Sequence, residues 1–298
     1  MCFLAGGAAA ADVKTGAKAV ATSTSTSTSS PDVTYPRPES LADERASYPL
    51  ALLKLSLKKA GDHYRLAASP VRMQQGRSLR LLEQGQGIDV VWTVTSQARE
   101  DAFLPVRIPI DRGLIGWRLL LIRPEDRALF APLATAAALA PLRAGQGHDW
   151  PDTDVLRANG YAVYTSSSYE RLFKMLESGH VQYFPRAVTE IWKEIEARKD
   201  APLAVADGIV LHYPEALYFF VNKSNTALAA AIEQGLRIAI ADGAMTALFQ
   251  RYYGAAIARA DLAHRTVLTL ANPLLPAATP LADQSLWFHP AARGKRLP

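Results

Sequence analysis

The chain has 298 residues, of which 49% are hydrophobic and 20% charged, and its net charge is +5. This composition is typical of a globular protein of about two domains, and the absence of long runs of like charge does not favour nucleic-acid binding. The single cysteine, Cys2, excludes an internal disulfide and a cysteine-based metal site, and no run of about 18 apolar residues predicts a membrane span.

The N-terminal residues 1–32 are not expected to belong to the folded core. Residues 1–11 are apolar and end in small residues, which is typical either of a secretory signal peptide that lacks its basic start or of a simple Ala-rich terminus. The run TSTSTSTSS within residues 12–32 is polar and of low complexity, which predicts a disordered linker. Ordered structure is therefore expected from residue 33.

The next part of the chain alternates helices and strands. Apolar residues at helical spacing predict a helix at 48–60, followed by a strand at 63–68 and a short helix ending at Gly85. The continuous apolar run IDVVWTV at 88–94 is typical of a buried parallel strand. A long apolar strand is expected at 114–122.

The middle segment, residues 145–191, reads as loop, helix, strand, helix, strand and helix. Pro151 suits a first helical position, and Ser167 with Glu170 forms a capping box for the next helix. Pro185 is expected to stop a short strand at 181–184. This alternation predicts a parallel sheet with covered faces, whose ligands lie beyond the carboxyl ends of the strands.

The C-terminal part is expected to return along strands at 209–221 and to continue through helices at 225–240 and near 248–252. The Pro-rich run at 268–276 cannot form a regular helix. It is expected to pack in extended form.

The run YTSSSYERLFKMLESGHVQYFPR resembles the second lobe of the family-3 extracellular solute-binding proteins, which have the type II periplasmic-binding fold. Tyr169, Leu172, Leu176 and Gly179 match the spacing of that family, whereas Gln182 replaces its usual Asp. The resemblance covers roughly residues 33–254 by element order. It implies an α/β, two-lobed clamshell with parallel or mixed sheets and a C-terminal extension.

The resemblance also implies domain boundaries. Residues 33–122 together with 214–254 would form the first lobe, and residues 123–213 the second. Residues 1–32 would be the signal-like remnant and linker, and residues 255–298 a tail that packs on a lobe.

Two ligand-binding positions are implied in the first lobe. Thr95 and Arg99 follow the strand at 88–94, where the family uses an Arg to clamp the ligand carboxylate. Pairing of Arg99 with Glu100 or Asp101 at the surface is the alternative. Tyr35 lies in the loop after the first strand, which touches ligand in the family, although a Pro-rich turn also explains this loop.

Further positions are implied in the second lobe. Gly147 precedes a helix whose amino end would bind an anion, although the acidic residues nearby oppose this and Gly147 would also serve a simple turn. Trp150 is expected at the cleft. Arg186 stands near a turn where amino-acid binders often use an acidic residue, and it favours a carboxylate-rich ligand. A pair between Arg186 and Glu190 is the plainer alternative.

These expectations favour a secreted or periplasmic protein that captures a small carboxylate-bearing or amino-acid-like solute by hinge closure. It would deliver the solute to the membrane permease of an ABC transporter, without a cofactor, a metal or nucleic acid. A sensory or interaction module on the same fold is the first alternative, motivated by the tail. An enzyme with His148 as base and Glu190 as acid is the second.

Overall fold

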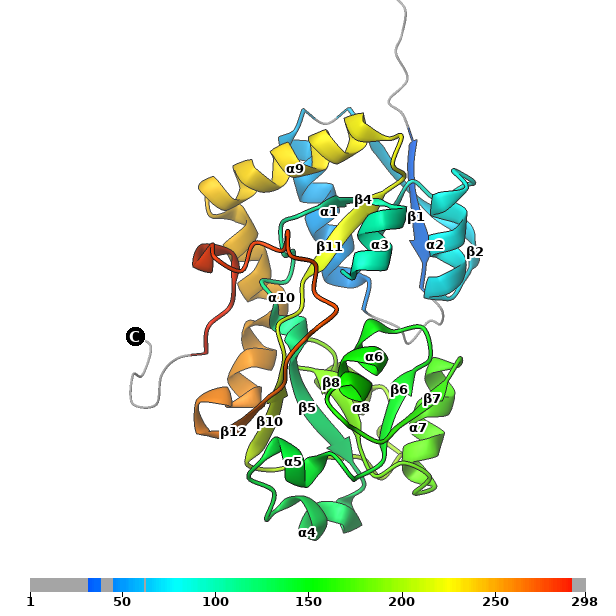
Figure 1. Cartoon of the computed structure of the whole chain (residues 1–298). Coiled ribbons are helices and arrows are strands. Elements are labelled where there is room, and N and C mark those ends of the chain that lie inside the picture. The colour runs from blue at the N-terminus through cyan, green and yellow to red at the C-terminus, as the bar shows by residue number, and fades with distance from the viewer. Residues whose placement is uncertain (1–31, 39–44, 62, 291–298) are drawn as a thin grey trace, which may run out of the picture. The chain divides into compact units, whose positions relative to one another are not determined.

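The computed structural model describes residues 32–38, 45–61 and 63–290. Apart from Asp32, which begins the first strand, the predicted signal-like segment and linker lie outside the described residues. The described chain contains the mixed α/β arrangement that the sequence predicts (Figure 1).

The first elements after the linker are two strands and a helix. Strand β1 (Asp32–Arg37) pairs in parallel with β2 (Arg65–Arg72), and α1 (Ser47–Lys59) connects them. Helix α1 buries Tyr48, Leu52 and Leu53 because residues at this spacing share one helical face. That face packs against α9 (Thr226–Ala241), as Figure 1 shows.

The first central sheet has the strand order β3-β11-β4. Strand β3 (Val90–Val94) and strand β4 (Leu104–Val106) both pair antiparallel with β11 (Leu217–Val221), which lies between them. The apolar run at 88–94 is therefore a buried strand, as predicted, but its expected parallel pairing is wrong. Helices α2 (Gln75–Glu83) and α3 (Gln97–Ala102) flank β3 in the sequence.

The second sheet has the order β12-β10-β5-β8, with β9 (Ala204–Val205) paired to β5. Strand β5 (Trp117–Ile122) is antiparallel to β10 (Ile209–His212) and to β8 (Phe184–Ala187). Strand β12 (Thr266–Thr269) is parallel to β10. The sheet is therefore mixed rather than purely parallel.

Two boundaries in the middle segment differ from the prediction. The expected loop at 145–147 belongs to strand β6 (Ala144–Gly147), which pairs in parallel with β7 (Val163–Ser166). Pro185 does not stop a strand but lies within β8, opposite Leu120 of β5. Strand β8 is the last strand in the order of its sheet, where the missing N–H of proline is tolerated.

The helices of the second half largely match the expected ones. Pro151 begins α6 (Pro151–Ala158), but the cap of α7 (Tyr169–Glu177) is Ser168 rather than Ser167, since Ser168 Oγ accepts from the Arg171 N–H. Helix α10 is much longer than expected. The remaining helices are α4 (Arg127–Phe130), α5 (Ala136–Leu139), α8 (Ile191–Glu196) and α10 (Ala244–Ala260).

The C-terminal extension contacts both sheet regions. After β12, Asn272 Nδ2 donates to the Pro214 carbonyl at 2.8 Å. Trp287 is buried among residues that pack on the β3-β11-β4 sheet, and the Phe288 N–H donates to the Arg112 carbonyl at 2.7 Å. Both acceptors lie in the segments that connect the two sheets.

Candidate functional site

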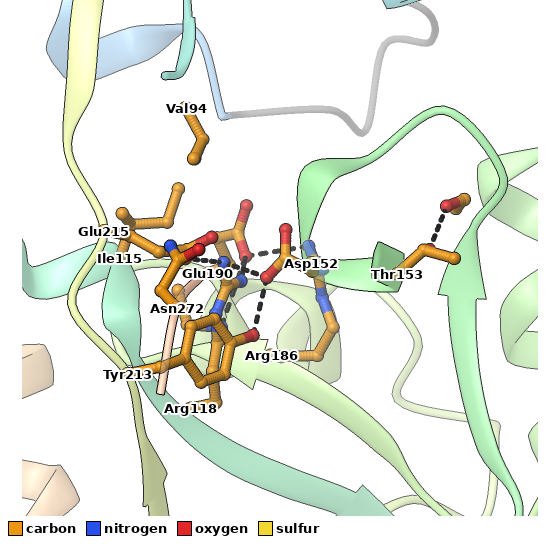
Figure 2. A network of polar contacts seen from close by, with 12 residues as sticks. Val94, Ile115, Arg118, Asp152, Thr153, Arg186, Glu190, Tyr213, Glu215 and Asn272 are labelled. Atoms are coloured by element: carbon orange, nitrogen blue, oxygen red, sulfur yellow. Dashed lines mark hydrogen bonds and ion pairs between the residues drawn. The ribbon is translucent and has the colours of Figure 1, made fainter. Parts of the chain in front are cut away.

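A cavity of about 190 Å³ lies between the two sheet regions. Residues of β3 and α1 line it from one side, and residues of β5, α6 and β8 line it from the other. Its walls carry six aromatic side chains: Tyr48, Trp92, Trp150, Tyr169, Tyr252 and Tyr253. Its floor carries a network of buried charges (Figure 2).

Arg118 of β5 is the centre of one half of this network. It is only 2% exposed, and Nη2 contacts both Asp152 of α6 and Glu215, the latter at 2.6 Å. Burial lowers the pKa of Arg118, but the negative charge of Asp152 and Glu215 outweighs it and the net shift is upward. Arg118 therefore stays charged.

Arg186 of β8 is the centre of the other half. Its Nε and Nη2 donate to the two carboxylate oxygens of Glu194 at 2.8 and 2.6 Å, and Nη2 lies 2.9 Å from Glu190. Tyr169 donates its hydroxyl to Glu194 at 2.6 Å. Burial raises the pKa of Glu194, but Arg186 and these hydrogen bonds bring it below its usual value. This two-pronged geometry is the strong form of a charged pair.

Glu215 and Asp111 are acidic groups whose pKa values are raised by burial. Glu215 is fully buried, and burial together with the neighbouring Asp152 raises the pKa of its carboxyl well above the usual range. Burial raises the pKa of Asp111 to about 7, although Ile115 and Gly113 donate backbone hydrogen bonds to it at 2.7 and 3.1 Å. Asp111 lines the cavity.

Three of the predicted ligand-binding residues line the cavity: Trp150, Arg186 and Glu190. The Trp150 ring lies 5.0 Å from the Arg186 guanidinium carbon. Gly147 is not among the lining residues. A Cβ on Gly147 would come closer than 3.0 Å to the Trp150 ring, so this glycine allows the ring to sit against β6.

The other three predicted residues, Arg99, Thr95 and Tyr35, are not among the residues that line the cavity. Arg99 is 9% exposed, and Nη1 donates to Thr93 Oγ1 at 2.8 Å and to the Val94 carbonyl at 2.6 Å. Its Nη2 donates to Gln75 at 3.1 Å and to the Asp149 carbonyl at 3.3 Å. Burial lowers the pKa of Arg99 to about 10. Its predicted alternative pairing with Glu100 or Asp101 is not among these contacts.

Thr95 and Tyr35 also have structural partners. Thr95 donates its hydroxyl to Glu100 at 2.7 Å, and the Tyr35 ring centroid lies 6.2 Å from that of Trp92. The ligand-binding role of all seven predicted residues stays a prediction. His148, the base of the enzyme alternative, has a side chain that is 53% exposed and does not line the cavity, whereas Glu190 does.

Several residues of the site were missed by sequence reasoning: Asp111, Arg118, Asp152, Glu194 and Glu215. Arg118 carried a signal, because a charged residue inside the apolar run LIGWRLLLI needs a buried partner. Asp152 is one of the acidic residues near Gly147 that oppose an anion site, and no sequence pattern predicts its contact with Arg118. Nothing local in the sequence connects Glu215 to either.

Neither a metal site nor a membrane-spanning helix is found among the residues that the structure describes. No group of three or more His, Cys, Asp or Glu side chains has a geometry that could hold a metal ion. Within the same described ranges, no helix combines the length and the apolar character needed to cross a membrane.

Comparison with known proteins supports the fold rather than a family. No family model matches the chain, and no curated protein matches it. The chain is similar to the solved structure of an ancestral arginine-binding protein bound to arginine, with 16% identity and a TM-score of 0.57. That match covers 76% of this chain and 99% of the other.

Two further solved structures show the same likeness. One is a periplasmic His/Glu/Gln/Arg/opine family-binding protein from Silicibacter pomeroyi in complex with lysine, with 11% identity, a TM-score of 0.57, and coverage of 75% of this chain and 97% of that one. The other is a histidine kinase sensor domain with similarity to periplasmic binding proteins, with 16% identity, a TM-score of 0.57 and coverage of 76% and 96%. The chain therefore has the two-lobed α/β fold of the amino-acid-binding periplasmic proteins, as the sequence predicts.

Proposed function

We propose that the chain is a solute-binding protein of the periplasm or the extracellular space, which captures a small amino-acid-like solute in the cavity. The observation that carries this proposal is the cavity itself, because residues from both sheets line it and aromatic rings stand on both sides. Small-molecule sites are concave, largely apolar, and provided with a few placed polar groups. Solved structures of similar fold hold arginine or lysine.

The mechanism would be closure of the two sheet regions around the solute. Residues 110–116 and 213–216 are two of the segments that join the sheets, and the Tyr213 N–H donates to the Gly116 carbonyl at 3.2 Å. Because these two segments lie against each other, a change of backbone angles there would move one region against the other. A solute that contacts both regions would favour the closed form.

Arg99 could bind a ligand carboxylate, as predicted, only after some of its present hydrogen bonds are broken. Its guanidinium would have to release Gln75 or the Asp149 carbonyl before it could turn to a ligand. Arg99→Ala therefore tests whether a carboxylate is held there, separately from whether a solute binds at all.

The direct test is a thermal-shift screen of purified protein with amino acids, small amines and small carboxylates. At least one solute should raise the melting temperature, because a ligand that binds only the folded state stabilises it. Trp150→Ala should remove this shift. Trp192→Ala is the matched control, since the Trp192 Nε1–H donates to the Ala256 carbonyl of α10 at 3.1 Å and Trp192 does not line the cavity. A complete screen without any shift, repeated by calorimetry, would refute solute binding.

We infer that the protein delivers the captured solute to the permease of an ABC transporter. The second candidate function is that of a sensory module, which is favoured by the similarity to the histidine kinase sensor domain. Uptake of labelled solute by cells with and without the gene separates them. Transport predicts that uptake is lost in the deletion strain, whereas sensing predicts unchanged uptake with altered gene expression. Fractionation of tagged protein tests the proposed location.

A further inference from the structure

Two carboxylates on the cavity floor each keep one oxygen without a hydrogen bond among the described residues. Asp152 is 4% exposed, and Oδ1 accepts from the Tyr213 hydroxyl at 2.7 Å and contacts Arg118. Glu190 uses Oε2 for Arg186 and for the Ala187 N–H at 3.3 Å. The second oxygen of each side chain points away from the two arginines, towards the side on which Val94 lies (Figure 2). Both residues line the cavity.

The buried network brings carboxyl and guanidinium groups together. Asp152, Glu190, Glu194 and Glu215 contact the guanidinium groups of Arg118 and Arg186. Arg99 interacts electrostatically with Asp152 and Glu215, and Arg45 with Glu194. The second oxygens of Asp152 and Glu190 nevertheless have no donor among the described residues. A carboxylate oxygen without a donor is costly when it is removed from water, so a cationic N–H donor is favoured at this floor.

Three further basic residues line the cavity, and all of them are more exposed than Arg118 and Arg186. Arg37 and Lys193 line the cavity but are exposed to solvent, which screens their charge. The Arg45 guanidinium carbon lies 4.5 Å from the centroid of the Tyr169 ring. Arg45 acts electrostatically on Glu194, both of whose oxygens already accept hydrogen bonds from Arg186.

The amino end of α6 does not favour an anion here. Pro151 lacks an N–H, and Asp152 and Asp154 already place negative charge in the first turn. The guanidinium groups nearest to the floor donate to carboxylates of the protein, so an anionic ligand would have to displace one of them.

We propose that Asp152 and Glu190 form a binding site for the cationic end of the solute, a protonated amine or a guanidinium group. This inference rests on the proposed function and specifies its ligand. The free oxygens accept N–H groups from the cation, and the rings of Trp92 and Trp150 line the same cavity, where aromatic faces stabilise positive charge. A carboxylate on the solute is not required for this recognition.

Calorimetric titration with matched probes tests the proposal: agmatine and putrescine as amines, arginine as their carboxylate-bearing counterpart, valerate as a carboxylate without a cation, and tetramethylammonium as a cation without N–H groups. At least one of the two amines should bind, and the dissociation constant of agmatine should lie within tenfold of that of arginine. Valerate and tetramethylammonium should bind at least tenfold more weakly than the amine that binds. Valerate or tetramethylammonium binding as tightly as that amine, or no binding of either amine, would overturn the proposal.

A pair of variants tests whether amine binding depends on the carboxylate of Glu190. Glu190→Gln should weaken amine binding at least tenfold, because an amide attracts a cation much less than a carboxylate does. Glu196→Gln is the matched control on α8, since Glu196 is exposed and pairs with Arg259 at the surface. Equal affinities of Glu190→Gln and Glu196→Gln for the amine would reject the role of Glu190. Asp152→Asn should reduce amine affinity as well, and circular dichroism must show that each variant is folded.

The outcomes separate this inference from the proposed function. If an uncharged or anionic solute binds and Trp150→Ala abolishes its binding, solute capture stands and the cation site is wrong. If no solute of any class binds, the proposed function itself fails.

Discussion

The Trp287 ring lies directly against the backbone of Gly113. A Cβ on Gly113 would come closer than 3.0 Å to two ring carbons of Trp287, and Gly113 has a φ of +70°. The C-terminal extension thus packs against the joining segment at residues 110–116, at a position where a side chain has no room.

Gly113→Ala is expected to destabilise the protein by more than the strain of a positive φ alone. The matched control is Gly208→Ala, because Gly208 has a φ of +69° and nothing within 4 Å of a built Cβ. Left-handed strain costs about 1–2 kcal/mol in both variants, and the clash with Trp287 adds to it only at Gly113. Urea unfolding should show the larger loss for Gly113→Ala, and equal losses would contradict the packing described.

Gly235→Ala is expected to be among the most destabilising single changes in the helices. A Cβ on Gly235 of α9 would overlap the backbone of Ser56 in α1, which forces the two helices apart. Gly254→Ala in α10 meets only the end of the Gln250 side chain and should be neutral or stabilising by up to about 1 kcal/mol. Thermal unfolding should therefore shift in opposite directions, or at least by clearly different amounts, in the two variants.

Removing Arg186 should be far more costly than removing a surface arginine. Arg186→Leu leaves Glu194 buried without its partner, and losses of about 3–5 kcal/mol are typical of such a change. Arg237→Leu breaks the exposed pair with Glu233 and should cost about 1 kcal/mol or less. Chemical denaturation measures both, and a similar cost for the two would mean that the buried pair contributes little.

The titration of Asp111 should make the protein less stable as the pH rises towards neutrality. The pKa of Asp111 is about 7 in the folded protein against 3.8 as the ordinary value, so the folded state binds a proton that the unfolded state has lost. The stabilisation is fully present below about pH 4 and disappears as the pH rises through 7. Asp111→Asn should reduce this decline, which unfolding at pH 4.5 and pH 8 can measure.

The titration of His212 should make the protein less stable as the pH falls, which is opposite to the effect of Asp111. Burial lowers its pKa to about 4 from an ordinary value of 6.5, and its ring lies 4.1 Å from the Trp117 ring by centroid distance. Its contribution is present above pH 6.5 and is lost as the pH falls through 4, since the unfolded state then binds the extra proton. His212→Phe keeps a ring beside Trp117 and should lose less stability than the parent between pH 7 and pH 4.5; an unchanged acid profile would refute this assignment.

The sequence predicts the fold better than the site, and the reason is the range of the interactions involved. Helix 48–60 and strand 114–122 follow from local apolar spacing, and the structure has α1 and β5 there, although residues 114–116 form a short 3₁₀ turn. The contact between Arg186 and Glu190 was weighed from their spacing, and the two lie 2.9 Å apart.

The contacts of Arg118 could not be predicted from local sequence spacing. Asp152 and Glu215 reach it from a helix and from a passage between the sheets that are distant in the sequence, so only the tertiary arrangement brings them together. The same holds for Nη2 of Arg99, which donates to a side chain of α2 and to the carbonyl of residue 149. The local sequence shows that such residues are charged, but only the tertiary structure determines which charged groups are in contact.

The central position of β11 has a consequence for synthesis of the protein. Val90 and Val221 are neighbours in the sheet, and β3 and β4 do not pair with each other but only with β11 between them. On the ribosome, the emerging first half of the chain therefore carries two strands without a partner until residue 221 has been translated. Folding must wait for most of the polypeptide, and the nascent chain exposes these edges to chaperones or to neighbouring chains in the meantime.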